Sequence, residues 1–441
     1  MVIPLFSVVI ATYDRGPLIE ATLSSVARQT IDDIEVLVVS DGPAASGLDA
    51  TVARFGERFH LVEIAVRCGS QFAPNNHAWS ISTGRFVAYL GHDDIWLPGH
   101  LAALRDTFEQ HPQADFAASG CLYFGPPGSG GGHTWVTGLF DPDDRWMAHT
   151  HFFPPSSVAH RRHLPHEIRW PDADVTRRPV DSEFMLTAAL HGCVFTSTRT
   201  ITVLKFNSAL RYLSYLTPDD DEQRRALALI DDPARLDATI QTALADAASS
   251  GNYMTTLHPG EFDREPGEAV RIHARIRGID TPPVKILDGP TWMPLDDDPC
   301  AFDWHGLERQ ADHSWRWSGP NPRPRLLIPF THNGPVRVSL HIARFATDDI
   351  SDSLAVLVDR RSTPTEIQQD PNTGRTVIEI DTMLRSDRPS VVELRMNRTV
   401  PPTEFDPGST DTRRMGLSLT GIHLDPSPPR VIFTKGAPAN A

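Results

Sequence analysis

A run of apolar residues that leads directly into two carboxylates limits the folds open to this chain. The segment Phe86–Asp94 reads FVAYLGHDD, in which five consecutive apolar or aromatic residues precede Gly91. A run without alternation is typical of a central strand in a parallel sheet that is covered on both faces. Asp93 and Asp94 then lie at the carboxyl end of a strand, where such sheets hold their ligands.

The two adjacent carboxylates have two readings. Neighbouring carboxylates repel each other, and a hard cation such as Mg²⁺ or Mn²⁺ that bridges to phosphate oxygens removes that cost. Alternatively, the pair lies in a solvated loop, and Asp94 caps the helix that follows it.

Strands and helices alternate through the first part of the chain. Buried strands are also predicted at 6–11, 34–39, 61–66 and 114–124, helices at 17–26, 48–59, 77–83 and 96–108, and a loop at 67–76. This order predicts an α/β fold with βαβ units, a mostly parallel sheet and flanking helices. Thr12, Asp41 and Asp93 would then line one edge of that sheet.

The pattern changes after about residue 250. Helical spacing covers 180–191 and 219–244, with a break at Pro233, whereas apolar residues alternate with polar ones at 270–277, 336–342 and 392–396. Strands are also predicted at 354–358, 376–380 and 417–424, with turns at 333–334 and 370–374. We expect a catalytic α/β domain over 1–215, a helical extension and linker over 216–300, an all-β sandwich over 301–428 and a tail over 429–441.

Composition excludes several classes of protein. A net charge of −15 at pH 7 argues against non-specific binding of nucleic acid, which needs a basic surface. The four cysteines form no CxxC pair, so neither a zinc cage nor a disulfide framework is indicated. The start lacks a basic n-region, and no apolar run approaches the ~20 residues that span a bilayer. We expect a cytoplasmic protein; peripheral attachment to the inner face of the membrane and a homo-oligomer stay open.

Four stretches together resemble a family-2 glycosyltransferase of the GT-A fold. They are FSVVIATYDR (6–15), IEVLVVSDG (34–42), NNHAWSISTGRFVAYLGHDD (75–94) and VDSEFML (180–186), and their order and spacing match the family jointly. The resemblance implies transfer of a sugar from a nucleotide diphosphate sugar to an acceptor hydroxyl, with inversion and with Mn²⁺ or Mg²⁺. A glycan, a lipid-linked compound or another hydroxyl compound would be the acceptor, in surface polysaccharide or glycoconjugate assembly.

The resemblance also implies roles for residues of the nucleotide site. Thr12 and Tyr13, followed by Asp14 in the same loop, and Asp41 at the next strand end match the residues that hold the nucleotide. Asn76 matches the Asn of the family's usual Arg-Asn pair.

Two departures from the family pattern affect this site. Asn75 replaces the usual Arg, so the expected cationic contact is either missing or supplied by Arg67. Gly91 stands where the family usually has the first Asp of its Asp-x-Asp-Asp motif. Asp93 then becomes the best metal ligand, with Asp94 beside it.

Asp181 matches the catalytic base of the family. A carboxylate within hydrogen-bond reach of the acceptor hydroxyl can take its proton as the hydroxyl attacks the sugar. Asp181 could instead only cap a helix, and Glu183 is the alternative base. Asp41 and Gly42 could likewise form a simple turn.

Further residues keep two readings each. His149 and His151 could complete a metal or diphosphate site or form structural hydrogen bonds, and Arg161 and Arg162 could grip phosphate or lie on a basic surface. Tryptophans in the distal part could stack on sugars or pack in a core; they are Trp292, Trp304, Trp315 and Trp317. Among enzymes, the alternative is a nucleotidyl- or phosphosugar-transferring protein on a similar sheet, but neither a G-x-x-x-x-G-K-[ST] loop nor a basic Gly-rich pyrophosphate signature is present. The departures at Gly91 and Asn75 keep open a non-catalytic glycan- or nucleotide-binding protein on a degenerate glycosyltransferase fold.

Overall fold

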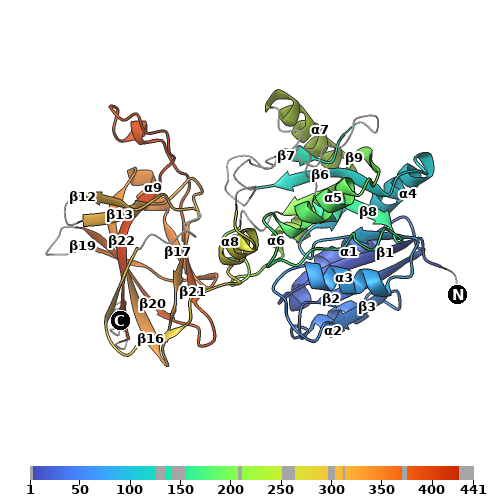
Figure 1. Cartoon of the computed structure of the whole chain (residues 1–441). Helices are drawn as coiled ribbons and strands as arrows, with labels where there is room; N and C mark the ends of the chain where they lie inside the picture. Colours follow the sequence, from blue (N-terminus) through green and yellow to red (C-terminus); the bar gives the residue numbers. More distant parts are fainter. Residues whose placement is uncertain are drawn as a thin grey trace, which may run out of the picture. The chain divides into compact units, whose positions relative to one another are not determined.

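The chain folds into two compact units, residues 1–275 and 276–441, in the computed structural model (Figure 1). The structure describes residues 3–125, 135–140, 154–206, 211–250, 264–295, 303–310, 313–369 and 375–426. Within this part of the chain, no helix combines the length and the apolar character needed to cross a membrane.

A nine-stranded sheet forms the centre of the first unit, in the order β3-β2-β1-β4-β8-β6-β9-β5, with β7 paired to β6. Its strands are β1 (Phe6–Thr12), β2 (Ile34–Ser40), β3 (Phe59–Glu63), β4 (Phe86–Tyr89), β5 (Ile95–Trp96), β6 (Phe116–Phe124), β7 (Trp135–Thr137), β8 (Val158–Arg161) and β9 (Phe195–Phe206). The four strands from β3 to β4 are parallel, whereas β8 pairs antiparallel with both β4 and β6.

Helices cover both faces of this sheet, which explains why its strands lack alternation. Val8 and Ile10 pack with residues of α1 (Glu20–Ala27), α2 (Leu48–Ala53) and α4 (His100–Gln110). Val9, which points the other way, packs with residues of α3 (Phe72–Ile81) and α5 (Val180–Leu190). All three side chains are fully buried. The prediction of an α/β fold with flanking helices is confirmed.

Several predicted boundaries were wrong. The helix predicted over 48–59 ends at Ala53, because Phe59 already begins β3. Trp96 lies in the short strand β5, and α4 begins only after Pro98 and Gly99. Helix α3 starts inside the predicted loop, at Phe72. Strand β8 was not predicted, because its residues show neither alternation nor an apolar run.

Three further helices follow the sheet. Helices α6 (Asp221–Ile230) and α7 (Pro233–Ser250) meet at the break predicted at Pro233. Through Ala226 and Ala243 they join the apolar cluster that contains Leu122 and Leu204 of the sheet. Residues 270–277 lie in helix α8 (Glu268–Arg277), so the predicted strand was wrong. The alternation is short, and its Ala and Arg residues are strong helix formers. Ala269, just before it, is fully buried.

Two antiparallel sheets form most of the second unit. The seven-stranded sheet contains β12 (Glu308–Gln310), β13 (His313–Trp317), β22 (Leu417–Asp425), β16 (Pro335–Phe345), β20 (Thr376–Met383) and β19 (Glu366–Gln369), with β11 (Thr291–Pro294) paired to β22. The four-stranded sheet contains β14 (Arg325–Ile328), β21 (Ser390–Arg395), β17 (Ala355–Val358) and β18 (Arg361–Ser362).

The two sheets share one apolar core, which Val338 and Ile422 join from one sheet and Val356 and Val392 from the other. The predicted β-sandwich is therefore confirmed. A short helix, α9 (Asp348–Ser353), and the two-stranded pair β10 (Lys285–Ile286) with β15 (Phe330–Thr331) complete this unit. The turn predicted at 333–334 connects β15 to β16, and the one at 370–374 lies outside the described residues.

Candidate functional site

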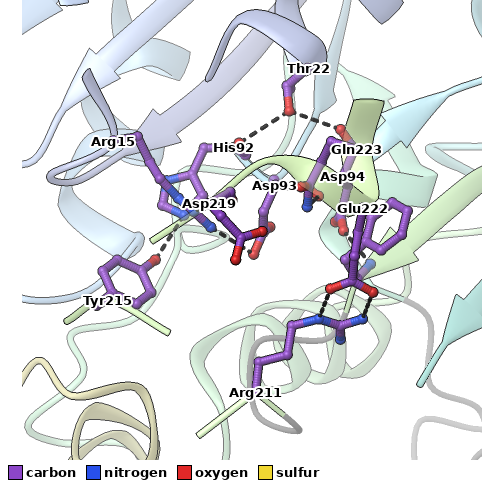
Figure 2. A network of polar contacts seen from close by, with 12 residues as sticks. Arg15, Thr22, His92, Asp93, Asp94, Arg211, Tyr215, Asp219, Glu222 and Gln223 are labelled. Atoms are coloured by element: carbon purple, nitrogen blue, oxygen red, sulfur yellow. Dashed lines mark hydrogen bonds and ion pairs between the residues drawn. The ribbon is translucent and has the colours of Figure 1, made fainter. Parts of the chain in front are cut away.

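The segment after β4 carries a network of polar contacts (Figure 2). The Asp93 carboxylate Oδ2 lies 3.4 Å from Nη2 of Arg15, and the two side chains are 13% and 8% exposed. The backbone oxygen of Asp93 accepts a hydrogen bond of 2.8 Å from Nε2 of Gln223 in α6. Arg15 also donates to the backbone oxygen of Asp219, at 3.4 Å. The loop after β1, the end of β4 and the start of α6 therefore meet at Asp93.

Asp94 makes different contacts from its neighbour. Its carboxylate is fully buried and accepts hydrogen bonds from Lys205 Nζ at 2.7 Å, from the Phe206 N–H at 3.1 Å and from the Ser156 hydroxyl. Burial raises the pKa of Asp94, and the Lys205 ammonium opposes that rise. The two carboxylates that the sequence places side by side thus have separate cationic partners.

Gly91 leaves space that this buried pair uses. Its N–H donates to the Ser156 hydroxyl at 3.0 Å. A Cβ atom at this position would lie 2.8 Å from Oδ2 of Asp94, closer than real Cβ atoms come, and 3.2 Å from the Ser156 oxygen, which is tighter than most real contacts. An aspartate here, as the family usually has, does not fit unless Asp94 or Ser156 moves.

Aromatic and guanidinium groups gather at the loop after β1. The Arg67 guanidinium lies 3.8 Å from the centroid of the Tyr13 ring, and Tyr13 stacks with Tyr215 at 6.2 Å. The Tyr215 hydroxyl is 2.8 Å from Nε2 of His92, and the Arg15 guanidinium lies 5.5 Å from the Tyr215 ring. Tyr215 therefore joins the Tyr13 side of the network to the residues around Asp93.

Asp41 fixes the loop that carries Arg67. Its two carboxylate oxygens accept hydrogen bonds of 2.8 Å from the N–H groups of Cys68 and Gly69. The Asp41 N–H donates to the backbone oxygen of Thr12. The Thr12 hydroxyl is buried and has no hydrogen-bond partner among the described residues. Asp41 thus lies at the predicted sheet edge, beside Thr12.

Asn76 contacts another part of the first unit. Its amide oxygen accepts from the Trp170 N–H at 3.0 Å, and its amide nitrogen donates to the Trp170 backbone oxygen at 2.8 Å. These paired bonds hold the backbone of residue 170 against α3.

Asp14 lies in the loop after β1. It is exposed and has a positive φ of 48°.

Asp181 lies in the first turn of α5 and is partly exposed. Its Oδ1 accepts a hydrogen bond of 2.9 Å from the N–H of Ser182. Glu183, the alternative base, forms an ion pair of 2.8 Å with Arg178.

The remaining candidate residues fall into two groups. Arg161 donates to the backbone oxygens of Ala114 and Pro112, and Arg162 donates to that of Ser82. Both guanidinium groups therefore form structural hydrogen bonds to the backbone. His149 and His151 lie outside the described residues. Among the residues that the structure describes, no three His, Cys, Asp or Glu side chains are grouped for a metal ion.

Sequence reasoning missed several residues of the network. They are Arg15, His92, Ser156, Lys205, Tyr215 and Gln223. Arg15 lies in the FSVVIATYDR stretch and could have been found there. His92 lies beside Asp93 in the FVAYLGHDD stretch and could have been found there too, whereas the other four come from segments distant in the sequence and carry no local signal.

Comparison with known proteins gives the class of the first unit. Residues 7–168 match the family model described as Glycosyl transferase family 2. Over this stretch, the resemblance of the motifs to glycosyltransferase family 2 is confirmed.

Individual relatives cover only parts of the chain. The uncharacterized glycosyltransferase YwdF of Bacillus subtilis is 29% identical over 42% of this chain and 67% of its own length. WfgD of Escherichia coli, named as a UDP-Glc:alpha-D-GlcNAc-diphosphoundecaprenol beta-1,3-glucosyltransferase, is 31% identical over 22% of this chain and 38% of its own. For an uncharacterized glycosyltransferase of Nostoc and for EpsJ of Bacillus subtilis, the chain spans about a third of their length. Among solved structures, TarS of S. aureus with UDP-GlcNAc aligns over 46% of this chain and 58% of its own, with 19% identity and a TM-score of 0.37.

Proposed function

We propose that the first unit transfers a sugar from a nucleotide diphosphate sugar to an acceptor hydroxyl, with inversion at the sugar carbon. The observation that carries this proposal is the connected network of Asp93, Arg15 and Tyr215 (Figure 2), which Tyr13 extends through its stacking on Tyr215. It combines a carboxylate for a metal ion, a guanidinium for phosphate and aromatic rings for a nucleotide base. These are the groups that a nucleotide diphosphate requires.

Asp93 is the proposed ligand of Mn²⁺ or Mg²⁺. Such ions are usually held by one or two carboxylates, and water and substrate phosphates complete the coordination. A single aspartate is therefore sufficient as the protein ligand. The bound ion would stabilise the charge that develops on the leaving diphosphate. Asp94 is a weaker candidate for a ligand, because Lys205, Ser156 and the Phe206 N–H already use its carboxylate. We assign it the role of fixing the strand end that presents Asp93.

The nucleotide would lie along the loop after β1. Tyr13 stacked under Arg67 offers a flat surface for a base, and Thr12, Asp14 and Asp41 lie at the same edge. Arg67 would replace the cation that the family has at position 75. Asn76 would act on this site indirectly, through the backbone of Trp170.

Asp181 is the proposed general base. It would accept the proton of the acceptor hydroxyl as that oxygen attacks the sugar carbon and the bond to the diphosphate breaks. The N-terminal turn of α5 favours an ionised carboxylate there. Glu183 is less suited, since Arg178 already neutralises it.

The acceptor is proposed to be a glycan or a lipid-linked sugar of a surface polysaccharide or glycoconjugate. The name of WfgD, which includes a diphosphoundecaprenol acceptor, supports the lipid-linked choice. Such an acceptor would place the chain on the cytoplasmic side, in peripheral contact with the membrane.

The alternative is a unit that binds nucleotide or glycan without transfer, favoured by the absence of a carboxylate at Gly91. Calorimetric titration with UDP, GDP and dTDP, each with Mn²⁺ and with EDTA, tests the donor site. We expect one nucleotide to bind in a metal-dependent way, and its labelled sugar conjugate to be hydrolysed or transferred. Nucleotide binding without transfer to any of the acceptors tested would favour the alternative. If no nucleotide binds, both the proposed donor site and the proposed metal ligand are refuted.

A further inference from the structure

The second unit carries one large aromatic side chain on the outer face of its seven-stranded sheet. Trp292 in β11 is 48% exposed, although Met293, its neighbour in the strand, packs against the apolar core. Alternation along a strand places the two on opposite faces. Its half-exposed indole offers a flat apolar face on which a ligand ring can stack.

The Trp292 ring is held in place. It lies against the backbone of Gly421 so closely that a Cβ atom there would collide with the indole. The His341 ring meets it at 5.0 Å, edge to face, with an interplanar angle of 73°. Because the ring is supported on two sides, little conformational entropy is lost when a ligand stacks on it.

A straight row of polar residues continues from Trp292 across the sheet, with Ser339 in its middle buried between the longer side chains on either side. The strand register pairs Trp292 with His423, His423 with Ser339, Ser339 with Glu379, and Glu379 with Glu366. Partners in a register share a face, so all five side chains start from the outer face of β11, β22, β16, β20 and β19, four of which can be followed in Figure 1. At about 4.8 Å per strand, the distance from Trp292 to Glu379 is about 14 Å.

Planar polar groups lie beside this row. Arg337 forms two hydrogen bonds of 2.9 Å to Asp381, and Gln368 donates to Glu379 at 3.3 Å. Carboxylate, amide and guanidinium groups each present two polar atoms in one plane, the spacing that neighbouring hydroxyls of a sugar ring can match. The apolar C–H face of the same sugar suits an indole ring.

The charge of the side chains on this face limits the class of ligand that it can bind. The row and its neighbours contain four carboxylates, those of Glu366, Glu379, Asp381 and Asp425, against the one guanidinium of Arg337. This excess repels phosphate and acidic polysaccharides. A symmetric contact with a second copy would bring the same carboxylates against each other. A cationic ligand would have to displace Arg337, which already pairs with both Glu379 and Asp381, so an uncharged ligand is favoured.

We propose that this face, the Trp292 row, binds a neutral glycan of several hexose units, with one ring stacked on Trp292 and the chain extended toward Glu379. Its identity as the acceptor or product chain of the transferase rests on the proposed function. Retaining that chain on the second unit would raise its local concentration for the first.

The test uses the full chain and a panel of neutral oligosaccharides of four to six hexoses, with α1,4, β1,4, β1,3 and β1,6 linkages. Calorimetry and tryptophan fluorescence should detect at least one with an affinity of about 0.1–10 mM. Trp292→Ala should weaken that binding by at least about tenfold, and Gly421→Ala, which displaces the ring without removing it, should weaken it too. Ile286→Ala is the matched control, since Ile286 is an exposed apolar side chain in the same unit, on the separate β10–β15 pair.

The outcomes separate this inference from the proposed function. If no oligosaccharide of the panel binds, or if Trp292→Ala binds it as the wild type does, the Trp292 row is not a glycan site, whatever the nucleotide titrations give. If Trp292→Ala instead changes the oligomeric state measured by light scattering, the row is an interface between copies and the proposal is overturned. Glycan binding that depends on Trp292, without any nucleotide binding, would uphold the row and refute the transferase.

Discussion

Arg15 and Asp93 form an ion pair of 3.4 Å between the loop after β1 and the end of β4. The pair lies at the point where we place the diphosphate of the donor. Asp93 faces a cation even without a metal, so its charge is compensated in both states. When a nucleotide and a metal bind, the guanidinium is placed to turn to a phosphate oxygen.

Asp93→Asn should weaken nucleotide binding in Mn²⁺ by about tenfold or more, equal to about 1.4 kcal/mol. The amide keeps the shape but loses the charge that holds the ion. In EDTA, the variant and the wild type should bind equally weakly. Calorimetry measures both states, and Asp49→Asn, at an exposed aspartate of α2, controls for the loss of one negative charge. Equal affinity of Asp93→Asn and wild type in Mn²⁺ would exclude Asp93 as the ligand.

Asp181→Asn should leave nucleotide affinity unchanged and lower the transfer rate by about 10²–10⁴, the usual contribution of a general base. Steady-state rates with a labelled donor and separate nucleotide titrations distinguish the two effects. Glu183→Gln, which breaks the ion pair with Arg178, should change the rate far less. If the two variants exchange these effects, Glu183 is the base.

Lys205→Met should lower the free energy of unfolding at pH 8 by about 3–5 kcal/mol, because it leaves the Asp94 carboxylate charged and unpaired in the interior. Burial already raises the pKa of Asp94, and loss of the ammonium would raise it further. A carboxyl whose pKa is raised on folding costs no stability below its unfolded pKa of about 4, and the cost grows with pH until the raised pKa is passed, so the loss should shrink from pH 8 toward pH 5.

Urea unfolding at the two pH values measures this difference. Arg54→Met removes the exposed ion pair with Glu20 and should cost less than about 1 kcal/mol at either pH. A loss for Lys205→Met that is equally small, or equal at both pH values, would mean that Asp94 is not ionised in the folded protein.

Gly91→Asp, which restores the family's usual carboxylate, should destabilise this protein by about 1–3 kcal/mol and should not strengthen metal-dependent nucleotide binding. The reason is steric: a Cβ there lies 2.8 Å from Oδ2 of Asp94. Gly99→Asp is the matched control, since nothing lies within 4 Å of a Cβ at Gly99 and aspartate suits that helix start. Tighter binding of Mn²⁺ and nucleotide by Gly91→Asp would contradict this account.

The first unit should lose stability as the pH falls from 6.5 toward 5. Burial lowers the pKa of His160 to about 4 and that of His100 to about 3, so the unfolded chain binds protons in this range that the folded one does not. Stability therefore rises with pH through the window, by up to about 1.4 kcal/mol per pH unit for each histidine.

Urea unfolding at half-unit pH steps gives this slope. His160→Asn should reduce the slope of stability against pH by the contribution of one histidine. His77→Asn, at an exposed position, should leave the slope unchanged. A wild-type stability that does not vary between pH 6.5 and 5 would show that these two histidines are protonated in the folded state.

The sequence by itself determined the elements that rest on local pattern. The unbroken apolar runs at β1, β2 and β4 predicted buried strands, and the alternation at β16 and β21 predicted a sandwich, because burial on two faces or one leaves a direct mark on residue order. The polar residues at the strand ends, Thr12, Asp41 and Asp93, followed from the same reasoning. The family motifs added the kind of ligand to expect.

Tertiary structure alone decided which side chains meet. Asp93 and Asp94 are adjacent in sequence, yet one pairs with Arg15 and the other with Lys205, 111 positions away. Asn76 carries a nucleotide-site motif, yet its amide holds the backbone at Trp170. These pairings depend on strand order and on the packing of distant segments, which leave no periodic signal in the residues themselves. The same holds for the Trp292 row, which exists only because four strand registers align residues from 292 to 423.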